Sequence, residues 1–347
     1  MNNSEKDLLK FAKRVVVKIG SGVLTENHGL NKNIIQTIAD QISILKEKKI
    51  EIILVSSGAI AAGVKKIGLD KRPEGIPARQ AAAAVGQAGL ILAWEQALAR
   101  DNHKVAQLLL TRDDLSHRRR YLNARNTINR LLSWNIIPVI NENDTVVIEE
   151  IKLGDNDNLA ALITLLMDAD LLINLTDIDG LYNKDPRENC DACLISKVTK
   201  ITKEMEKAAA GIPGNLGTGG MLSKIKAAKK LNRAGIPMII ACGKEKNKGT
   251  YFIPGQKRLN SRKCWIAFNL KARGTLFLDK GAENAIRNNG KSIFPIGITS
   301  VTGDFTVVGA PVEIRTENNT PLGKGLVNYS SADINIVNNP YPKGIGA

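Results

Sequence analysis

Short apolar runs alternate with longer amphipathic stretches over the first 243 residues of the chain. The short runs have the length of strands and little polar character on either face, which is typical of strands buried between two layers. The longer stretches place apolar residues three and four positions apart, as helices with one buried face do. We therefore expect strands at 14–20, 51–58, 104–110, 136–141, 171–177 and 237–243, and helices at 31–48, 78–100, 121–134, 156–168 and 221–234.

This alternation predicts an α/β fold, a mainly parallel sheet sandwiched between helices. In such sheets ligands bind at the carboxyl ends of the strands. Small or polar residues stand at that end of four predicted strands, namely Gly20, Ser57, Asn141 and Asp177. The Ser-Ser-Gly turn that contains Ser57 either offers donors to an anion or caps the helix that follows. We expect a ligand-binding site along this edge.

The pattern changes after residue 243. Residues 244–263 are polar and interrupted by Gly and Pro, which indicates a linker or surface segment. From 264 to 347 the apolar runs are short, strand-like and separated by glycines. The sequence therefore predicts an α/β domain over 1–243 and a small β-rich domain over 264–347.

Composition argues against several classes of protein. No apolar run is long enough to cross a membrane, and no apolar segment of a secretory signal precedes the first predicted strand. Four cysteines are too few for a disulfide framework in 347 residues. Cys190 and Cys193 form a C-x-x-C pair, and the sequence contains no second such pair. Ordinary loop thiols are therefore favoured over a metal or redox site. We expect a soluble, cytoplasmic protein.

Positive charge is concentrated in one segment. Residues 196–263 hold 16 basic and 3 acidic side chains, while the net charge of the whole chain is +15. The sequence leaves two interpretations open, a surface that faces an anionic partner and a solvated lysine-rich face.

Two glycine-rich segments carry a lysine and suit phosphate binding. Lys18 stands in a run of Val and Ile that ends in Gly20–Ser21–Gly22, so it is either exposed along an edge or directed into an anion-binding crevice. A glycine cluster at 214–220 leads into a basic helix with Ser223 and Lys224, without the residue order of a P-loop. Together the two segments suggest a nucleoside triphosphate held between them.

Carboxyl and amide side chains crowd two further segments, 139–146 and 154–158. Four short polar residues, Asp155 to Asn158, begin a predicted helix for which one cap is enough. Neighbouring carboxylates repel one another unless cations balance them. Lys18, Lys224, a metal ion and a substrate ammonium are the candidate cations.

Seven motifs occur in the order and spacing of one known family. They are KIGSGVLT, SSGAIAAG, RYLNARNT, PVINENDTV, GDNDNLAAL, LTDIDGLYNKDPR and GTGGMLSK. The chain thus resembles the glutamate 5-kinase family of the amino acid kinase superfamily along nearly its whole length. Residues 264–347 resemble the PUA domain that bacterial members append. The resemblance implies the amino acid kinase fold for the first domain.

The resemblance implies a role for each matching residue. Lys18 and Lys224 would contact the transferred phosphoryl group, and Asp157 would orient the two lysines. The glutamate site would be formed by Ser57, Asn141, Asp144 and Asn156. The ATP site would be lined by Lys18, Gly20, Thr176, Asp177, Thr218, Gly219, Gly220, Met221, Leu222, Ser223 and Lys224. Within the polar run at the helix start, Asp155 or Asn156 would serve as the cap, and Asn158 has no assigned role.

The reaction implied is ATP-dependent phosphorylation of the side-chain carboxylate of L-glutamate, the first step of proline biosynthesis. The implied cofactors are ATP and Mg²⁺, with the ion carried mainly by the ATP phosphates and no metal site on the protein. The resemblance also implies a homo-oligomer and feedback inhibition by proline. The labile acyl phosphate product implies glutamate-5-semialdehyde dehydrogenase as the pathway partner.

Two alternatives stay open. The first is the same fold with another acceptor, namely aspartate, N-acetylglutamate, carbamate or a nucleoside monophosphate. An acid for an unblocked amino group favours free glutamate over these acceptors. An RNA-binding protein that uses the PUA-like domain is disfavoured, because residues 264–347 hold 8 basic and 6 acidic side chains and aromatic residues make up only 4% of the chain. No membrane partner is expected.

Two positions depart from the family pattern. Gly22 stands where relatives commonly have a hydroxyl residue, and Ser223 stands where threonine is usual. The segment 243–263 also matches poorly. These departures concern one phosphate contact and the linker, and they leave both lysines and the acids in place.

Overall fold

The computed structural model describes residues 11–26, 29–147, 156–210, 220–245, 248–255, 257–289, 292–306 and 308–338. The chain divides into two compact units, a large unit of residues 1–261 and a small unit of residues 262–347. Three residues named above, Asp155, Thr218 and Gly219, lie outside the described residues.

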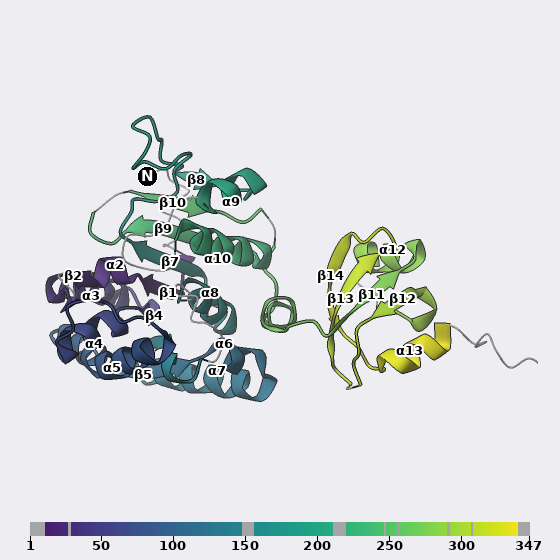
Figure 1. The fold of residues 1–347 in the computed structure, drawn as a ribbon, viewed down its shortest axis with the longest axis horizontal. Coiled ribbons are helices and arrows are strands. Elements are labelled where there is room, and N and C mark those ends of the chain that lie inside the picture. The colour runs from purple at the N-terminus through teal and green to yellow at the C-terminus, as the bar shows by residue number, and fades with distance from the viewer. Residues whose placement is uncertain are drawn as a thin grey trace, which may run out of the picture. The chain divides into compact units, whose positions relative to one another are not determined.

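The large unit is built on an eight-stranded sheet in the order β5-β6-β4-β1-β7-β9-β10-β8 (Figure 1). Neighbouring strands are parallel except that β10 runs antiparallel to β9. The strands are β1 (Arg14–Ile19), β4 (Glu51–Ser56), β5 (Val105–Leu110), β6 (Ile137–Glu142), β7 (Leu171–Thr176), β8 (Lys197–Val198), β9 (Met238–Cys242) and β10 (Gly249–Phe252). The predicted fold class, a mainly parallel sheet between helices, is confirmed.

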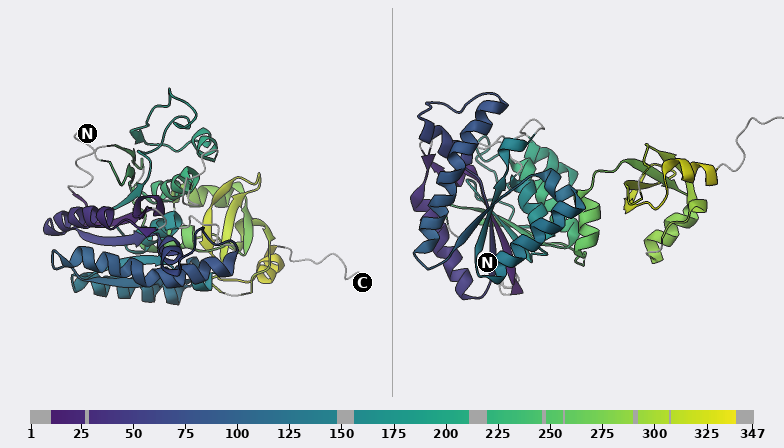
Figure 2. Two further views of the ribbon diagram at one scale, coloured as in Figure 1. Left: turned by 60° about the vertical axis from the view of Figure 1, so that its left-hand side comes forward. Right: turned by 90° about the horizontal axis from the view of Figure 1, so that it is seen from below.

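Helices cover both faces of this sheet, as the end-on view in Figure 2 shows. One layer contains α3 (Lys32–Glu47), α4 (Ala59–Ile67) and α5 (Ile76–Ala99), and the other contains α7 (Arg118–Ser133), α8 (Asn156–Leu166) and α10 (Met221–Ala234). Shorter elements are α2 (Ser21–Leu24), β2 (Thr25–Glu26), β3 (Gly29–Leu30), α6 (Arg112–Ser116), the 3₁₀ turn η1 (Asp144–Val146) and α9 (Lys203–Ala210).

The alternation of side chains along β1 explains where its one lysine points. Val15, Val17 and Ile19 pack in the core cluster that includes α3 and α5. Side chains of successive strand residues point to opposite faces. Lys18 therefore faces the other layer, where it reaches the first turn of α8.

Helix α8 is buried along nearly its whole length. Asp157 and every residue from Leu159 to Leu166 are buried. A helix that is apolar all round belongs inside a protein rather than on its surface. The helix packs against the sheet and against α10.

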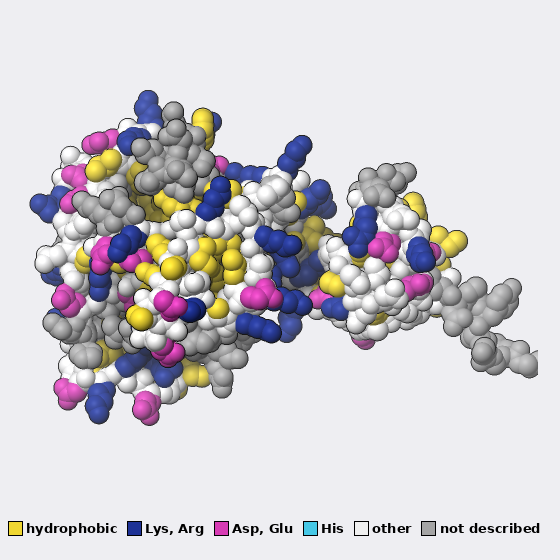
Figure 3. Space-filling model, turned by 90° about the horizontal axis from the view of Figure 1, so that it is seen from above, with side chains coloured by type: hydrophobic (Ala, Val, Ile, Leu, Met, Phe, Trp, Pro, Cys, Tyr) yellow, Lys and Arg dark blue, Asp and Glu magenta, His cyan; other side chains and the backbone are white. Residues whose placement is uncertain are grey.

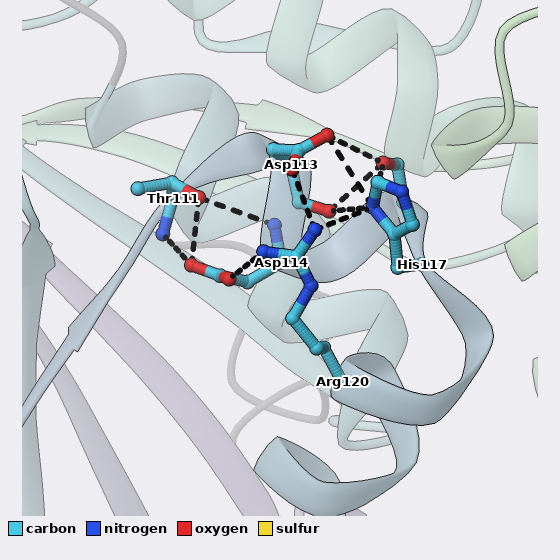
Figure 4. A network of polar contacts seen from close by, with 6 residues as sticks. Thr111, Asp113, Asp114, His117 and Arg120 are labelled. Carbon is cyan, nitrogen blue, oxygen red and sulfur yellow. Dashed lines mark hydrogen bonds and ion pairs between the residues drawn. The ribbon is translucent and has the colours of Figure 1, made fainter. Parts of the chain in front are cut away.

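A capping network fixes the chain where it leaves β5 (Figure 4). The Thr111 side chain accepts from the backbone N–H of Asp114, and the Asp114 carboxylate accepts in return from the Thr111 backbone N–H. Arg120 of α7 pairs with Asp113 at 2.7 Å and with Asp114 at 2.8 Å. Burial by itself raises the pKa of Asp114, but hydrogen bonds from Thr111 and the charge of Arg120 hold that pKa below its ordinary value. The network joins α6 to α7.

Part of the segment expected to be a linker belongs to the large unit. Gly249–Phe252 forms β10 within the large sheet. Farther along, the Arg258 guanidinium pairs with Asp170 at 2.8 Å, and the Ser261 hydroxyl donates to the Asp168 carboxylate over 2.8 Å. These contacts attach residues up to 261 to the turn that precedes β7.

The small unit has a four-stranded sheet in the order β12-β11-β13-β14. Its elements are α11 (Ser261–Cys264), which begins one residue before the unit, a π-helical turn (Trp265–Asn269), β11 (Gly274–Leu278), α12 (Lys280–Asn289), a 3₁₀ turn (Pro295–Gly297), β12 (Ile298–Thr302), β13 (Pro311–Thr316), β14 (Pro321–Leu326) and α13 (Ser331–Asn338). Leu276, Leu278, Phe305 and Val312 lie in its core. The expected β-rich second region is confirmed.

The basic segment contributes exposed side chains to the large unit. Lys and Arg side chains gather in Figure 3 on the side where α9 and the carboxyl end of α10 lie in Figure 1. The exposed side chains of residues 196–263 include Lys203, Lys207, Lys226 and Arg233.

Candidate active site

The carboxyl ends of β1, β4, β6 and β7 meet at one edge of the sheet, and the first turns of α8 and α10 face it. The Gly20 N–H donates to the carbonyl of Leu175 over 2.9 Å, and the Ser57 N–H donates to the carbonyl of Ile19 over 3.1 Å. These contacts hold the chain together as it leaves three neighbouring strands. The edge predicted from the sequence to bind ligand is therefore formed.

Three charged side chains meet in the interior at this edge, and we call them the lysine–aspartate cluster. The Nζ atom of Lys18 lies 2.6 Å from Oδ1 of Asp157, and the Nζ atom of Lys224 lies 3.3 Å from Oδ2. The Asp157 side chain is fully buried, and each lysine side chain is 6% exposed. With both lysines protonated, the cluster carries a net charge of +1.

The pKa shifts follow from this arrangement. Burial by itself raises the pKa of Asp157, but the charges of Lys18 and Lys224 outweigh burial and hold that pKa well below its ordinary value. Burial lowers the pKa of Lys18; the Asp157 charge opposes this shift and the Lys224 charge adds to it. Asp157 is therefore ionised at neutral pH and pairs with both lysines.

Two neutral donors complete the coordination of the Asp157 carboxylate. The Nδ2 group of Asn174, on β7, donates to Oδ1 over 2.8 Å. The hydroxyl of Ser223, on α10, donates to Oδ2. Replacing the family's usual threonine by Ser223 thus preserves a hydroxyl that contacts this carboxylate.

A chain of uncharged side chains lies beside the cluster, and we call it the amide network. The Nδ2 group of Asn156 donates to the Ser57 hydroxyl and to Oδ1 of Asn141, each over 2.9 Å. The Nδ2 group of Asn141 donates to Oε1 of Gln87, on α5, over 2.9 Å. Oδ1 of Asn156 is buried and accepts no hydrogen bond from a described residue.

Asp144 adds an acid near the glutamate residues implied by the resemblance. It begins η1, and its backbone carbonyl accepts from the Gln80 amide over 2.9 Å. Burial raises the pKa of Asp144 to about 6, and the charge of Arg72 opposes that shift. An Asp with this pKa changes its charge just below neutral pH.

Gly22, which departs from the family pattern, lies against the Asp177 carboxylate. Thr176 donates through its hydroxyl to Oδ1 of Asp177 over 3.1 Å. A Cβ atom placed on Gly22 would lie only 2.9 Å from Oδ2 of Asp177. Any larger residue at position 22 would therefore have to displace the Asp177 carboxylate.

The remaining predicted ATP residues stand at the start of α10. Gly220 is the N-cap of this helix, Met221 is buried and Leu222 is half-buried. Asn158, to which we gave no role, accepts a hydrogen bond from Lys230 farther along α10. It therefore joins α8 to α10 rather than facing a substrate group.

Sequence reasoning missed two polar residues of the site, Asn174 and Gln87. Asn174 interrupts an apolar strand in the same way as Lys18 interrupts β1, so the same signal was available. Gln87 lies in an alanine-rich helix and contacts Asn141 only through tertiary packing, so no local signal marks it.

The described residues contain no group of three or more His, Cys, Asp and Glu side chains arranged to hold a metal ion. The part of the chain that the structure describes also has no helix long and apolar enough to span a membrane.

Comparison with known proteins shows the family of the chain. The amino acid kinase family model matches residues 13–242, and the PUA domain model matches residues 274–340. Glutamate 5-kinase of Geobacter sulfurreducens is 49% identical over 338 residues, which cover 94% of this chain and 90% of that protein. Glutamate 5-kinase of Caldanaerobacter subterraneus is 47% identical over 92% of this chain and 89% of its own length.

Solved structures extend the likeness in fold. The aspartate kinase of Synechocystis superposes with a TM-score of 0.50 at 16% identity, covering 77% of this chain and 44% of that one. At this identity the match concerns the fold alone. From the family models and the close relatives together, the chain belongs to the glutamate 5-kinases of the amino acid kinase family, with a PUA domain in its small unit.

Proposed function

We propose that the chain transfers the γ-phosphoryl group of ATP to the side-chain carboxylate of L-glutamate, with Lys18, Lys224 and Asp157 as the catalytic residues. The buried lysine–aspartate cluster, with two cations for one anion, is the observation that carries this assignment. It holds two ammonium groups on one carboxylate at the edge of the sheet, where a transferred phosphoryl group needs positive charge.

The acceptor in this reaction needs no general base. The side-chain carboxyl of free glutamate has a pKa of about 4.3 and is already ionised at neutral pH. Catalysis then consists of placing the two substrates in line and balancing charge as two anions approach each other. Lys18 and Lys224 supply that charge, while Asp157 holds both ammonium groups at the same place.

The amide network binds the amino acid end of glutamate. Its orientation leaves Oδ1 of Asn156 buried and unoccupied by any described donor, and this acceptor suits the substrate ammonium. Ser57 and Asn141 hold Asn156 in that orientation. Asp144, which is half-buried, supplies a negative charge for the same ammonium.

ATP lies along Gly20, Thr176, Asp177 and the start of α10 in this proposal. Glycines allow backbone N–H groups to approach phosphate, and the N-terminus of α10 favours an anion. In this proposal the ATP phosphates supply the main ligands of Mg²⁺. When bound, the ion neutralises negative charge on the phosphates.

The product would be an acyl phosphate, which water hydrolyses readily, so a reductase must consume it promptly. This places the reaction at the first step of proline synthesis, with glutamate-5-semialdehyde dehydrogenase next. Assembly as a homo-oligomer, inhibition by proline and a cytoplasmic location remain predictions from the family.

The test is formation of glutamyl hydroxamate from ATP, Mg²⁺, glutamate and hydroxylamine. We expect hydroxamate with glutamate and little with aspartate or N-acetylglutamate. Activity with either alternative acceptor but not with glutamate would contradict the proposal. Repeating the assay with added proline tests feedback inhibition in the same experiment.

A further inference from the structure

We propose that Asn174 is a positioning residue for phosphoryl transfer and acts through Asp157. The inference rests on the roles proposed above for the lysine–aspartate cluster. Asn174 lies on β7 and is fully buried. None of the motif roles considered above includes it.

Strand register places Asn174 beside a catalytic lysine. β1 and β7 are parallel neighbours, and Lys18 is the register partner of Asn174. Paired residues on adjacent strands point to the same face of a sheet. Both side chains therefore lie beneath the start of α8, and both contact Oδ1 of Asp157, at 2.6 Å from Lys18 and 2.8 Å from Asn174.

The Asp157 carboxylate receives one charged and one neutral donor on each oxygen. Oδ1 contacts Lys18 and Asn174. Oδ2 contacts Lys224 and Ser223. Four donors fix the plane of the carboxylate, and the neutral donors share its charge. Each lysine is then held in place while the negative charge of Asp157 is shared among four donors.

Packing alone does not account for an asparagine at this position. The flanking residues of β7 are apolar, and Oδ1 of Asn174 is buried without a hydrogen-bond donor among the described residues. An unpaired buried amide oxygen costs stability, so an apolar residue would be favoured here if packing were its only role. A carboxylate oxygen only accepts hydrogen bonds, which identifies the Asn174 atom that faces Asp157 as Nδ2.

Loss of this donor should affect catalysis more than substrate binding. Without Asn174, the Asp157 carboxylate is free to turn and to draw Lys18 away from the phosphoryl position. Partners of this kind around metal ligands typically contribute about 10- to 100-fold to activity. We expect Asn174→Leu to lower kcat by about 10- to 100-fold, with the KM values for ATP and glutamate changed by less than about threefold.

The experiment is a double-mutant cycle in the hydroxamate assay with Asn174→Leu, Asp157→Asn and the double variant. If Asn174 acts through Asp157, its substitution costs little further activity once position 157 is Asn. The matched control is Thr164→Val, which removes another buried hydrogen bond, from the Thr164 hydroxyl to the carbonyl of Ala160 on the same α8. This control should keep wild-type kcat.

Two results would overturn the inference. One is a kcat for Asn174→Leu as close to wild type as that of Thr164→Val. The other is a decrease in kcat on adding Asn174→Leu to Asp157→Asn that is as large as the decrease in the wild-type protein. If the Leu variant does not fold, Asn174→Ser adds no volume and enters the same cycle. A wild-type protein inactive on glutamate would contradict the proposed function instead, so the two failures are distinguishable.

Discussion

The two residues that begin α8 serve two different halves of the site. Asp157 belongs to the lysine–aspartate cluster, in which every member is charged. Asn156 belongs to the amide network, whose members are all neutral. Removing a charge leaves the opposite charge buried without a partner, whereas removing an amide leaves one hydrogen bond unmade. We therefore expect substitutions in the charged half to cause larger losses of stability and activity than substitutions in the neutral half.

The largest effect is expected for Asp157→Asn. It preserves the shape of the side chain but removes the carboxylate that both buried lysines contact, and breaking a buried ion pair in this way costs about 3–5 kcal/mol of stability. The folded-state pKa of Asp157 is depressed, so its contribution is present above the ordinary carboxyl pKa and is lost as the pH falls below that value. Unfolding by urea at pH 7 and at low pH measures both effects.

Turnover provides the second part of this prediction. Asp157→Asn should also abolish most hydroxamate formation, because the lysines lose their common anchor. Full turnover in this variant would mean that Asp157 only caps the helix, and the charged half would then have no catalytic meaning.

The next effect is expected for Lys18→Ala and for Lys224→Ala. Each removes one donor to the developing charge, and a loss of this kind costs about 3–4 kcal/mol, mainly in kcat. The control is Lys226→Ala, on the exposed face of the same α10. Steady-state kinetics with ATP and glutamate varied in turn should separate kcat from KM; a change confined to KM would contradict a role in the transfer step.

A smaller effect concerns Asp144, the acid beside the neutral half. Because the pKa of Asp144 is raised to about 6, the group loses its charge as the pH falls through that value. We expect kcat/KM for glutamate to fall by about tenfold per pH unit below 6. Asp144→Asn should give a low value that does not change between pH 5 and 7.

Stability should show the opposite trend at this position. A raised pKa means that the folded protein favours the protonated acid, so ionised Asp144 lowers stability at neutral pH. Asp144→Asn should therefore raise the thermal midpoint at pH 7 but not at pH 4. A midpoint raised equally at both values would exclude charge as the cause.

The smallest effect is expected for Gln87→Leu at the far end of the amide network. It leaves Nδ2 of Asn141 without its acceptor, which costs about 1–2 kcal/mol and should appear as a higher KM for glutamate. An unchanged kcat would complete the contrast with the charged half. A kcat loss as large as that of Lys18→Ala would show that the two halves are not separate.

The fold could be predicted from the sequence because its signals are local, and several candidate site residues are marked in the same way. Lys18 was recognisable as a lysine in an apolar strand, and the polar start of α8 was recognisable as more than a cap. Gln87 and the approach of Gly22 to Asp177 depend on segments far apart in the chain, so no local pattern predicts them. Asn174 is a polar residue in an apolar strand, as Lys18 is, but it lies outside the glycine-rich turns, so the sequence alone assigns it no role.

The burial of α8 has a consequence for the choice of acceptor. Asn156 and Asp157 are consecutive at the start of a helix that is buried from Leu159 onward, so in the proposed arrangement the helix backbone sets the separation between the amino acid end and the phosphoryl end. An acceptor one methylene shorter than glutamate would leave its carboxylate about 1.5 Å short of the lysines. The backbone of one helical turn would then determine the chain length of the acceptor. Accepting a shorter substrate would require a different turn rather than the exchange of one side chain.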